Sequence, residues 1–251
     1  MQIKQTTQTA AIAGATVREL LRRCNALILL VTLPLAFYLA RSDVPSSALV
    51  VLALGVGWAV ATLSLFSTVS ALDLDLRLRV AGYSTAAIVL GRLGAVLAFG
   101  TVLSIGFFAL AMLDQDVPKP GGLALMLLCA IVVGAPLGMA TGLLLRRELE
   151  GMLLLLILLA TQFMTNPEKA SAHWLPLWSV RGVADWTFDF ADGSTIVDGL
   201  SDGLLHAAAT VALLTVVLAA VSAVRLRIHA PHTVLPPVGS SIDEELADQA
   251  P

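Results

Sequence analysis

The chain has 251 residues and a formal net charge of −3, with 57% hydrophobic and only 13% charged residues. Soluble domains carry about 25% charged residues, and a soluble protein of this length could not bury so much apolar surface. The composition therefore excludes an ordinary soluble protein. We predict an all-α integral membrane protein, because helices satisfy their own backbone hydrogen bonds in lipid.

Several apolar runs approach or exceed the roughly 20 residues that a helix needs to cross a bilayer. The first run ends at "FYLARSD" without a small-residue cleavage site, so we expect a retained span rather than a signal peptide. Six transmembrane helices are predicted, of which the first and fifth are short. Their ranges are Cys24–Ala40, Ala48–Ala71, Ala86–Leu113, Leu123–Leu145, Leu149–Thr165 and Leu204–Val224.

The basic residues predict the orientation. With the N-terminus inside, eleven of the 15 lysines and arginines fall on the cytoplasmic side, as the positive-inside rule requires. The other side then holds Arg41, Lys119, Lys169 and Arg181. Both termini are therefore expected to be cytoplasmic.

The stretch "TVRELLRRCN" before the first span predicts a helix in the membrane interface. Thr16 and Glu19 have the spacing of a capping box, which favours a helix start at Thr16. The arginines would face anionic headgroups. The opposite face would comprise Ala13, Val17, Leu20, Leu21 and Cys24. Alternatively, the segment is a plain basic flank that only sets the topology.

The stretch "LDLDLRLR" after the second span predicts a short cytoplasmic helix within Leu72–Tyr83. A lone strand would leave an unpaired edge, whereas a helix places Asp73 four residues before Arg77 and Asp75 four before Arg79. Gly82 is expected to end the helix and Ser84 to cap the next one. Its leucines either lie back on the membrane and neighbouring spans or dock a cytoplasmic partner.

The stretch "TNPEKASAHWLPLWSVRGVADW" is too apolar for an ordinary loop and too short to cross. Asn166 and Pro167 signal a helix start, and Pro176 breaks the segment. We predict two outer re-entrant half-helices before the sixth span. The tryptophans also fit an interfacial belt.

Motifs for catalysis are absent from the sequence. It has no G-x-x-x-x-G-K-[ST] or G-x-G-x-x-G phosphate-binding motif and no H-E-x-x-H or G-x-S-x-G motif. We therefore expect no enzyme activity, bound metal or cofactor in this chain. The absence of an acid or base in mid-span argues against an ion-driven carrier.

These features together resemble the permease subunits of ABC-2 type exporters, and bacterial drug-export permeases most of all. The resemblance covers nearly the whole chain and includes "STAAIVLGRLGAVL" after the short helix and "RRELEGMLLLL" at the entry to the fifth span. It implies an all-α permease domain over 1–228 in a bacterial inner membrane, followed by a disordered cytoplasmic tail over 229–251.

The resemblance also implies partners and site residues. A separate ABC ATPase subunit would hold ATP and magnesium, a second permease subunit would complete the dimer, and membrane lipids would surround it. We expect no nucleic-acid partner. The coupling helix that receives motion from the ATPase would comprise the residues Leu74, Arg77, Leu78, Arg79, Gly82 and Tyr83.

In the resembled family, spans two and five line the substrate pathway. Carried over, the pathway residues are Ser64, Ser67, Thr68, Thr161 and Gln162. Such mild polarity in an apolar wall suits a hydrophobic or amphipathic compound, such as a drug or a lipid-like molecule. The alternative is that these groups bond to their own helix or to neighbours. For the whole chain, the alternative is a membrane scaffold that docks a partner and transports nothing.

Overall fold

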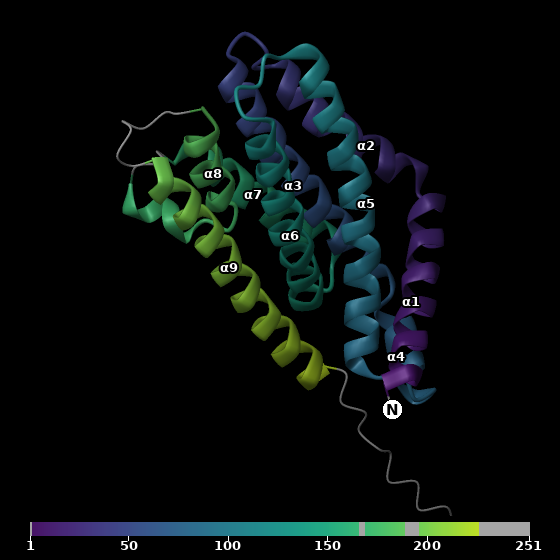
Figure 1. Cartoon of the computed structure of the whole chain (residues 1–251). Helices are drawn as coiled ribbons and strands as arrows, with labels where there is room; N and C mark the ends of the chain where they lie inside the picture. The colour runs from purple at the N-terminus through teal and green to yellow at the C-terminus, as the bar shows by residue number, and fades with distance from the viewer. Residues whose placement is uncertain (1, 166–168, 189–195, 226–251) are drawn as a thin grey trace, which may run out of the picture.

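The computed structural model describes residues 2–165, 169–188 and 196–225, in which every regular element is a helix (Figure 1). The predicted tail over 229–251 and the helix start at Asn166 and Pro167 lie outside these residues. The helices are α1 (Gln2–Arg22), α2 (Cys24–Leu39), α3 (Pro45–Ser70), α4 (Leu72–Val80), α5 (Thr85–Asp114), α6 (Pro120–Leu145), α7 (Glu148–Met164), a 3-10 turn η1 (Ala170–Trp174), α8 (Trp178–Phe188) and α9 (Ile196–Arg225).

Four of the described helices are long and apolar enough to cross a membrane: α3, α5, α6 and residues Gly199–Val224 of α9. They lie where the sequence predicts spans two, three, four and six. Helices α2 and α7 coincide with predicted spans one and five but have only 16 and 17 residues, fewer than the roughly 20 that a crossing requires. The structure is consistent with an all-α membrane protein, and the number of six spans stays a prediction.

The core of the molecule is the contact between α3 and α6. A Cβ built at Gly138 would overlap the carbonyl oxygen of Ala61, and one at Gly134 would overlap that of Gly57. Glycines at four-residue spacing therefore let the two backbones touch. The structure thus places these glycines in a contact within the chain.

Helix α1 is longer than the capping-box pattern predicts. It begins at Gln2, and Thr16 lies inside it with an exposed fraction of 5%. Ile12, Thr16 and Leu20 are buried at four-residue spacing, whereas Leu21 is exposed. The predicted start and part of the predicted face are wrong. Packing against α5 extends the helix, because tertiary contact outweighs local start signals.

Helix α4 has the predicted position and ends as predicted. Gly82 has a φ of +88°, the Tyr83 amide donates to the Leu78 carbonyl (3.0 Å) and the Gly82 amide donates to the Arg79 carbonyl (3.0 Å). These two bonds form a Schellman motif, for which glycine is the favoured residue. The Ser84 hydroxyl accepts from the Ala87 amide (3.1 Å) and caps α5. The turn therefore fixes the angle between α4 and α5.

The segment between α7 and α9 forms two short helical elements, η1 and α8, with Pro176 between them. This confirms the predicted break. Helix α8 packs on α6 and α9, and Gly182 of α8 lies against Gly203 of α9, where a Cβ would be 3.0 Å from the Gly203 Cα. Its depth in a membrane stays a prediction.

The two ends of the bundle carry different segments. Figure 1 shows the N-terminus, α4 and the last turns of α9 at one end, and α8 at the other. The charge pattern predicts that the first group is cytoplasmic and that α8 is external. The structure groups the segments as this prediction requires, while the sidedness itself remains a prediction.

Cysteine labelling in sealed cells checks the sidedness. In a background with Cys24 and Cys129 replaced by serine, Asp116→Cys should react with an impermeant maleimide and Arg147→Cys should not, because the two exposed side chains belong to opposite predicted sides. Both should react equally after the cells are broken. The reverse pattern in intact cells would invert the topology.

Candidate functional site

A buried ion pair joins α4 to α5. The two guanidinium nitrogens of Arg92 donate to the two carboxylate oxygens of Asp75 at 2.8 and 2.7 Å, and the residues are 4% and 2% exposed. The predicted pair between Asp75 and Arg79 is wrong, since Arg79 donates instead to the carbonyl of Tyr83 (2.9 Å). A buried arginine requires a counter-charge, whereas an exposed pair within one helix contributes only about 0.2–0.5 kcal/mol.

This pair was not predicted from the sequence, where Arg92 counted only as one of the eleven basic residues on the predicted cytoplasmic side. A signal was present, because Arg92 is the eighth residue of the apolar helix α5. A cation at such a position needs a partner. Asp75 is the nearest acid before it in sequence. The pair gives α4 a rigid connection to a candidate span.

A cleft of about 570 Å³ lies between α1, α4 and the beginning of α5. Its walls are mostly small or apolar, with charged side chains among them. The lining residues are Ala11, Ile12, Ala15, Thr16, Arg18, Glu19, Arg22, Ala71, Leu74, Leu78, Tyr83 and Arg92. The cleft is wide enough for a small ligand, since ligand pockets usually measure about 300–1,000 Å³.

The predicted coupling residues divide into three groups in the structure. Leu74, Leu78 and Tyr83 line the cleft. Arg77 is exposed, and Arg79 and Gly82 belong to the turn described above. Whether any of them meets a partner stays a prediction.

The outward face of α4 contains two apolar residues that the predicted set lacks. Leu76 and Val80 are 45% and 75% exposed, and neither lines the cleft. Arg77 is also exposed and also lies outside the cleft lining. Helical spacing could have indicated this face, since Leu76 and Val80 are four residues apart. Helix α4 therefore has exposed apolar side chains, and an exposed cation, outside the cleft.

Polar contacts tie α1 to this end of the bundle. The Gln8 side chain donates to the carbonyl of Gly82 and accepts from the amide of Ser84, both at 3.4 Å. The Glu19 carboxylate accepts from the Ser70 hydroxyl (2.9 Å) and pairs with Arg23 (3.0 Å). Helix α1 is thus bonded to the end of α3 and to the turn after α4.

The predicted pathway residues do not all share one environment. Ser64, Ser67 and Thr68 are buried in α3, and the Thr68 hydroxyl donates to the Ser64 carbonyl (2.7 Å). Thr161 is exposed on α7, where its hydroxyl donates to the Ile157 carbonyl (2.8 Å). For Thr68 and Thr161 the structure shows the alternative interpretation, bonding within their own helix. A pathway role for the five residues remains untested.

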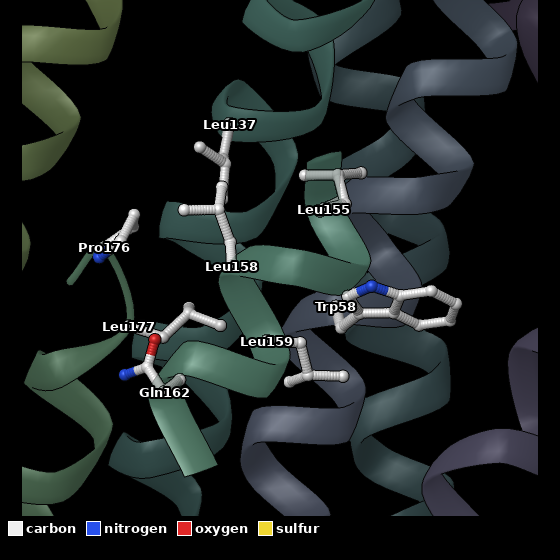
Figure 2. A pocket seen from close by; sticks show the side chains of 9 residues that line it. Trp58, Leu137, Leu155, Leu158, Leu159, Gln162, Pro176 and Leu177 are labelled. Atoms are coloured by element: carbon white, nitrogen blue, oxygen red, sulfur yellow. The ribbon is translucent and has the colours of Figure 1, made fainter. Parts of the chain in front are cut away.

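Gln162 borders a small cavity between α3, α7 and the segment at Pro176 (Figure 2). The cavity measures about 20 Å³, which is enough for one water molecule. Within the described part of the chain, the Gln162 amide nitrogen and the Trp58 indole nitrogen have no hydrogen-bond partner. Leu155 and Leu159 supply much of the remaining wall. The cavity suits a buried water and is far too small for a drug-like compound.

Arg181 of α8 caps the end of α7. Its guanidinium donates to the carbonyls of Thr165 (2.9 Å) and Gln162, where a cation favours the negative end of the helix dipole. Burial raises the pKa of the nearby Asp185 carboxyl, and the charge of Arg181 partly offsets that rise. Helix α8 is therefore attached to the end of α7 through the backbone beside Gln162.

The described histidines belong to an aromatic cluster. His173 stacks on Trp178 with ring centroids 4.0 Å apart, and His206 meets the same indole edge-on at 5.3 Å. Within the described residues, no group of three His, Cys, Asp or Glu side chains could hold a metal ion. The cluster packs α8 against α9.

No protein-family model matches the chain, and no curated protein matches it. The resemblance to ABC-2 permeases therefore continues to depend on the architecture and on the residues quoted above.

Proposed function

We propose that the chain is the transmembrane subunit of an ATP-driven exporter of the ABC-2 type. The observation that carries the proposal is α4, a nine-residue helix outside the candidate spans that is locked to α5 by the buried pair of Asp75 and Arg92. A partner that moves α4 would move α5 with it, because a bidentate buried pair leaves little freedom between the two helices.

The partner is a separate ABC ATPase subunit, which docks on the outward face of α4. Leu76 and Val80 supply the apolar contact, and the exposed Arg77, next to Leu76 in sequence, pairs with acids of the partner. Exposed apolar residues beside a cation are typical of interface centres. The hydrogen bonds from Gln8 to the turn after α4 carry the same motion to α1.

Two such permease subunits, identical or paralogous, move a hydrophobic or amphipathic compound outward by alternating access. The cavity beside Gln162 holds only a water-sized volume. The route for substrate therefore lies at the interface with the second permease subunit or opens when α3 and α7 separate. Ser64, Ser67 and Gln162 remain the proposed polar lining, because their buried polar atoms lack partners in the described residues.

Disruption of the outward face of α4 tests the proposal. Leu76→Ser with Val80→Glu should reduce export-linked ATP hydrolysis and co-purification of an ATPase subunit at least tenfold, because interface energy concentrates in a few central residues. The readouts are ATP turnover of the purified complex and identification of the bound subunit by its G-x-x-x-x-G-K-[ST] motif.

The matched control makes the same two replacements at the opposite end of the bundle, Leu113→Ser with Val44→Glu, where both residues are also exposed. The control variant should still co-purify with the ATPase subunit. Full turnover in the α4 variant would contradict the docking surface. A complex that assembles but never hydrolyses ATP would favour the second candidate, a non-transporting scaffold.

A further inference from the structure

We propose that the cleft between α1, α4 and α5 is a binding site for an anionic phospholipid, with an acyl chain in the cleft and the phosphate on Arg18 and Arg22. This inference is independent of the exporter proposal, since it concerns the surface of α4 that faces α1.

The shape and chemistry of the cleft suit an acyl chain. The volume is about 570 Å³, and α1 contributes the small side chains of Ala11 and Ala15 to its wall while α4 contributes Leu74 and Leu78. Leu74 lines the cleft opposite α1 and is still 49% exposed, so the described residues cover only about half of this residue. Burial of an acyl chain there removes apolar area from water on both partners.

The charges at the cleft favour an anionic ligand. Arg18 and Arg22 line it and are exposed, and within the described residues neither forms an ion pair. The acids nearby are already engaged: Glu19 binds Arg23 and Ser70, and Asp75 binds Arg92. Two cations without counter-ions beside an apolar cleft match a phosphodiester attached to a hydrocarbon chain.

The position of the cleft favours a membrane lipid over a soluble anion as its ligand. Ala71, which follows the last residue of α3, and Arg92, which lies near the beginning of α5, both line it, so the cleft sits at the ends of two candidate spans. Headgroups lie at this level of a bilayer, and basic pockets between helices on the cytoplasmic side bind anionic headgroups. A bound lipid would fill the space between α1 and α4 and hold α4 at a fixed distance from α1.

Binding of single lipids to the purified full-length chain tests this inference. Native mass spectrometry in detergent, with added dioleoylphosphatidylglycerol or dioleoylphosphatidylcholine, counts the lipids on each chain. We expect one phosphatidylglycerol to bind at least tenfold more tightly than phosphatidylcholine. Arg18→Gln with Arg22→Gln should abolish that preference, because it removes both headgroup contacts.

Two further variants separate the cleft from general surface charge. Arg77→Gln with Arg146→Gln removes the same charge at the same end of the bundle but outside the cleft, and it should keep the preference. Ala15→Trp fills the cleft and leaves both arginines, and it should lose the tight lipid.

If Arg77→Gln with Arg146→Gln lost the preference for phosphatidylglycerol as fully as Arg18→Gln with Arg22→Gln, the site would be overturned in favour of nonspecific charge attraction. Retained lipid in Ala15→Trp would also overturn it. If that variant instead lost an ATPase subunit and kept its lipid, the cleft would belong to the protein partner. Variants are compared only where gel filtration shows a monodisperse peak, and the two arginine pairs decide the question if Ala15→Trp fails to fold.

Discussion

Gly138→Ala is expected to lower the free energy of unfolding by about 2–3 kcal/mol, even though alanine is the better helix former by about 1 kcal/mol. The new methyl group would overlap the carbonyl oxygen of Ala61 on α3. That atom is backbone inside a buried helix, so it cannot rotate away as a side chain would. Helices α3 and α6 must separate, and the close contact along Gly134 and Gly138 is lost.

The matched control is Gly94→Ala in α5. A Cβ at Gly94 meets nothing within 4 Å, so this change should be neutral or stabilise by about 0.5–1 kcal/mol through helix propensity. Unfolding of the purified protein in mixed micelles, followed by circular dichroism, gives both values. Equal stabilities for the two variants would show that α3 and α6 do not touch at Gly138.

The helices of this fold were predictable because their signals are long apolar runs. Helix α5, predicted as Ala86–Leu113, spans Thr85–Asp114, and α6, predicted as Leu123–Leu145, spans Pro120–Leu145. Local turn chemistry was equally informative at Gly82 and Ser84, where a glycine with positive φ and a serine cap leave few alternatives.

The beginning of α1 was not predictable from such signals. The segment before Thr16 is a mixture of small and polar residues, and its helix is buried against α5 at Ile12 and at Gly91, where a Cβ would be 2.7 Å from the Thr9 carbonyl oxygen. Only a partner helix reveals which face of such a segment is buried. The cleft, which needs α1 as a wall, could not be predicted for the same reason.

The position of α4 was predictable from the sequence, whereas the predicted pairing of Asp75 was wrong. The "LDLDLRLR" stretch correctly indicated a short helix, but spacing within one helix cannot show that a residue 17 positions away lies closer. Asp75 pairs with Arg92 rather than with Arg79, because Arg92 is buried and its charge has no other partner within the described residues. Burial, which sequence shows only indirectly, decided the pairing.

Breaking this pair is expected to have the largest effect of any single change at the candidate site. Asp75→Asn leaves the Arg92 guanidinium buried without a counter-charge, which typically costs about 3–5 kcal/mol. The variant should unfold at a markedly lower temperature or accumulate poorly in the membrane. Asp73→Asn is the control, because Asp73 is an exposed acid two residues away on the same helix, and it should change stability by less than about 0.5 kcal/mol.

The double variant Asp75→Leu with Arg92→Met separates stability from coupling. Replacing a buried ion pair by apolar side chains of similar size is often neutral or stabilising, so this protein should recover most of the unfolding free energy lost in Asp75→Asn. It should still fail to link ATP hydrolysis to transport, because a leucine and a methionine hold α4 on α5 without the directional bidentate contact. A double variant that is as stable and as active as the original chain would reduce the pair to a structural element and remove the proposed link between α4 and α5. A stable but uncoupled variant would show that motion of α4 reaches the spans through Arg92.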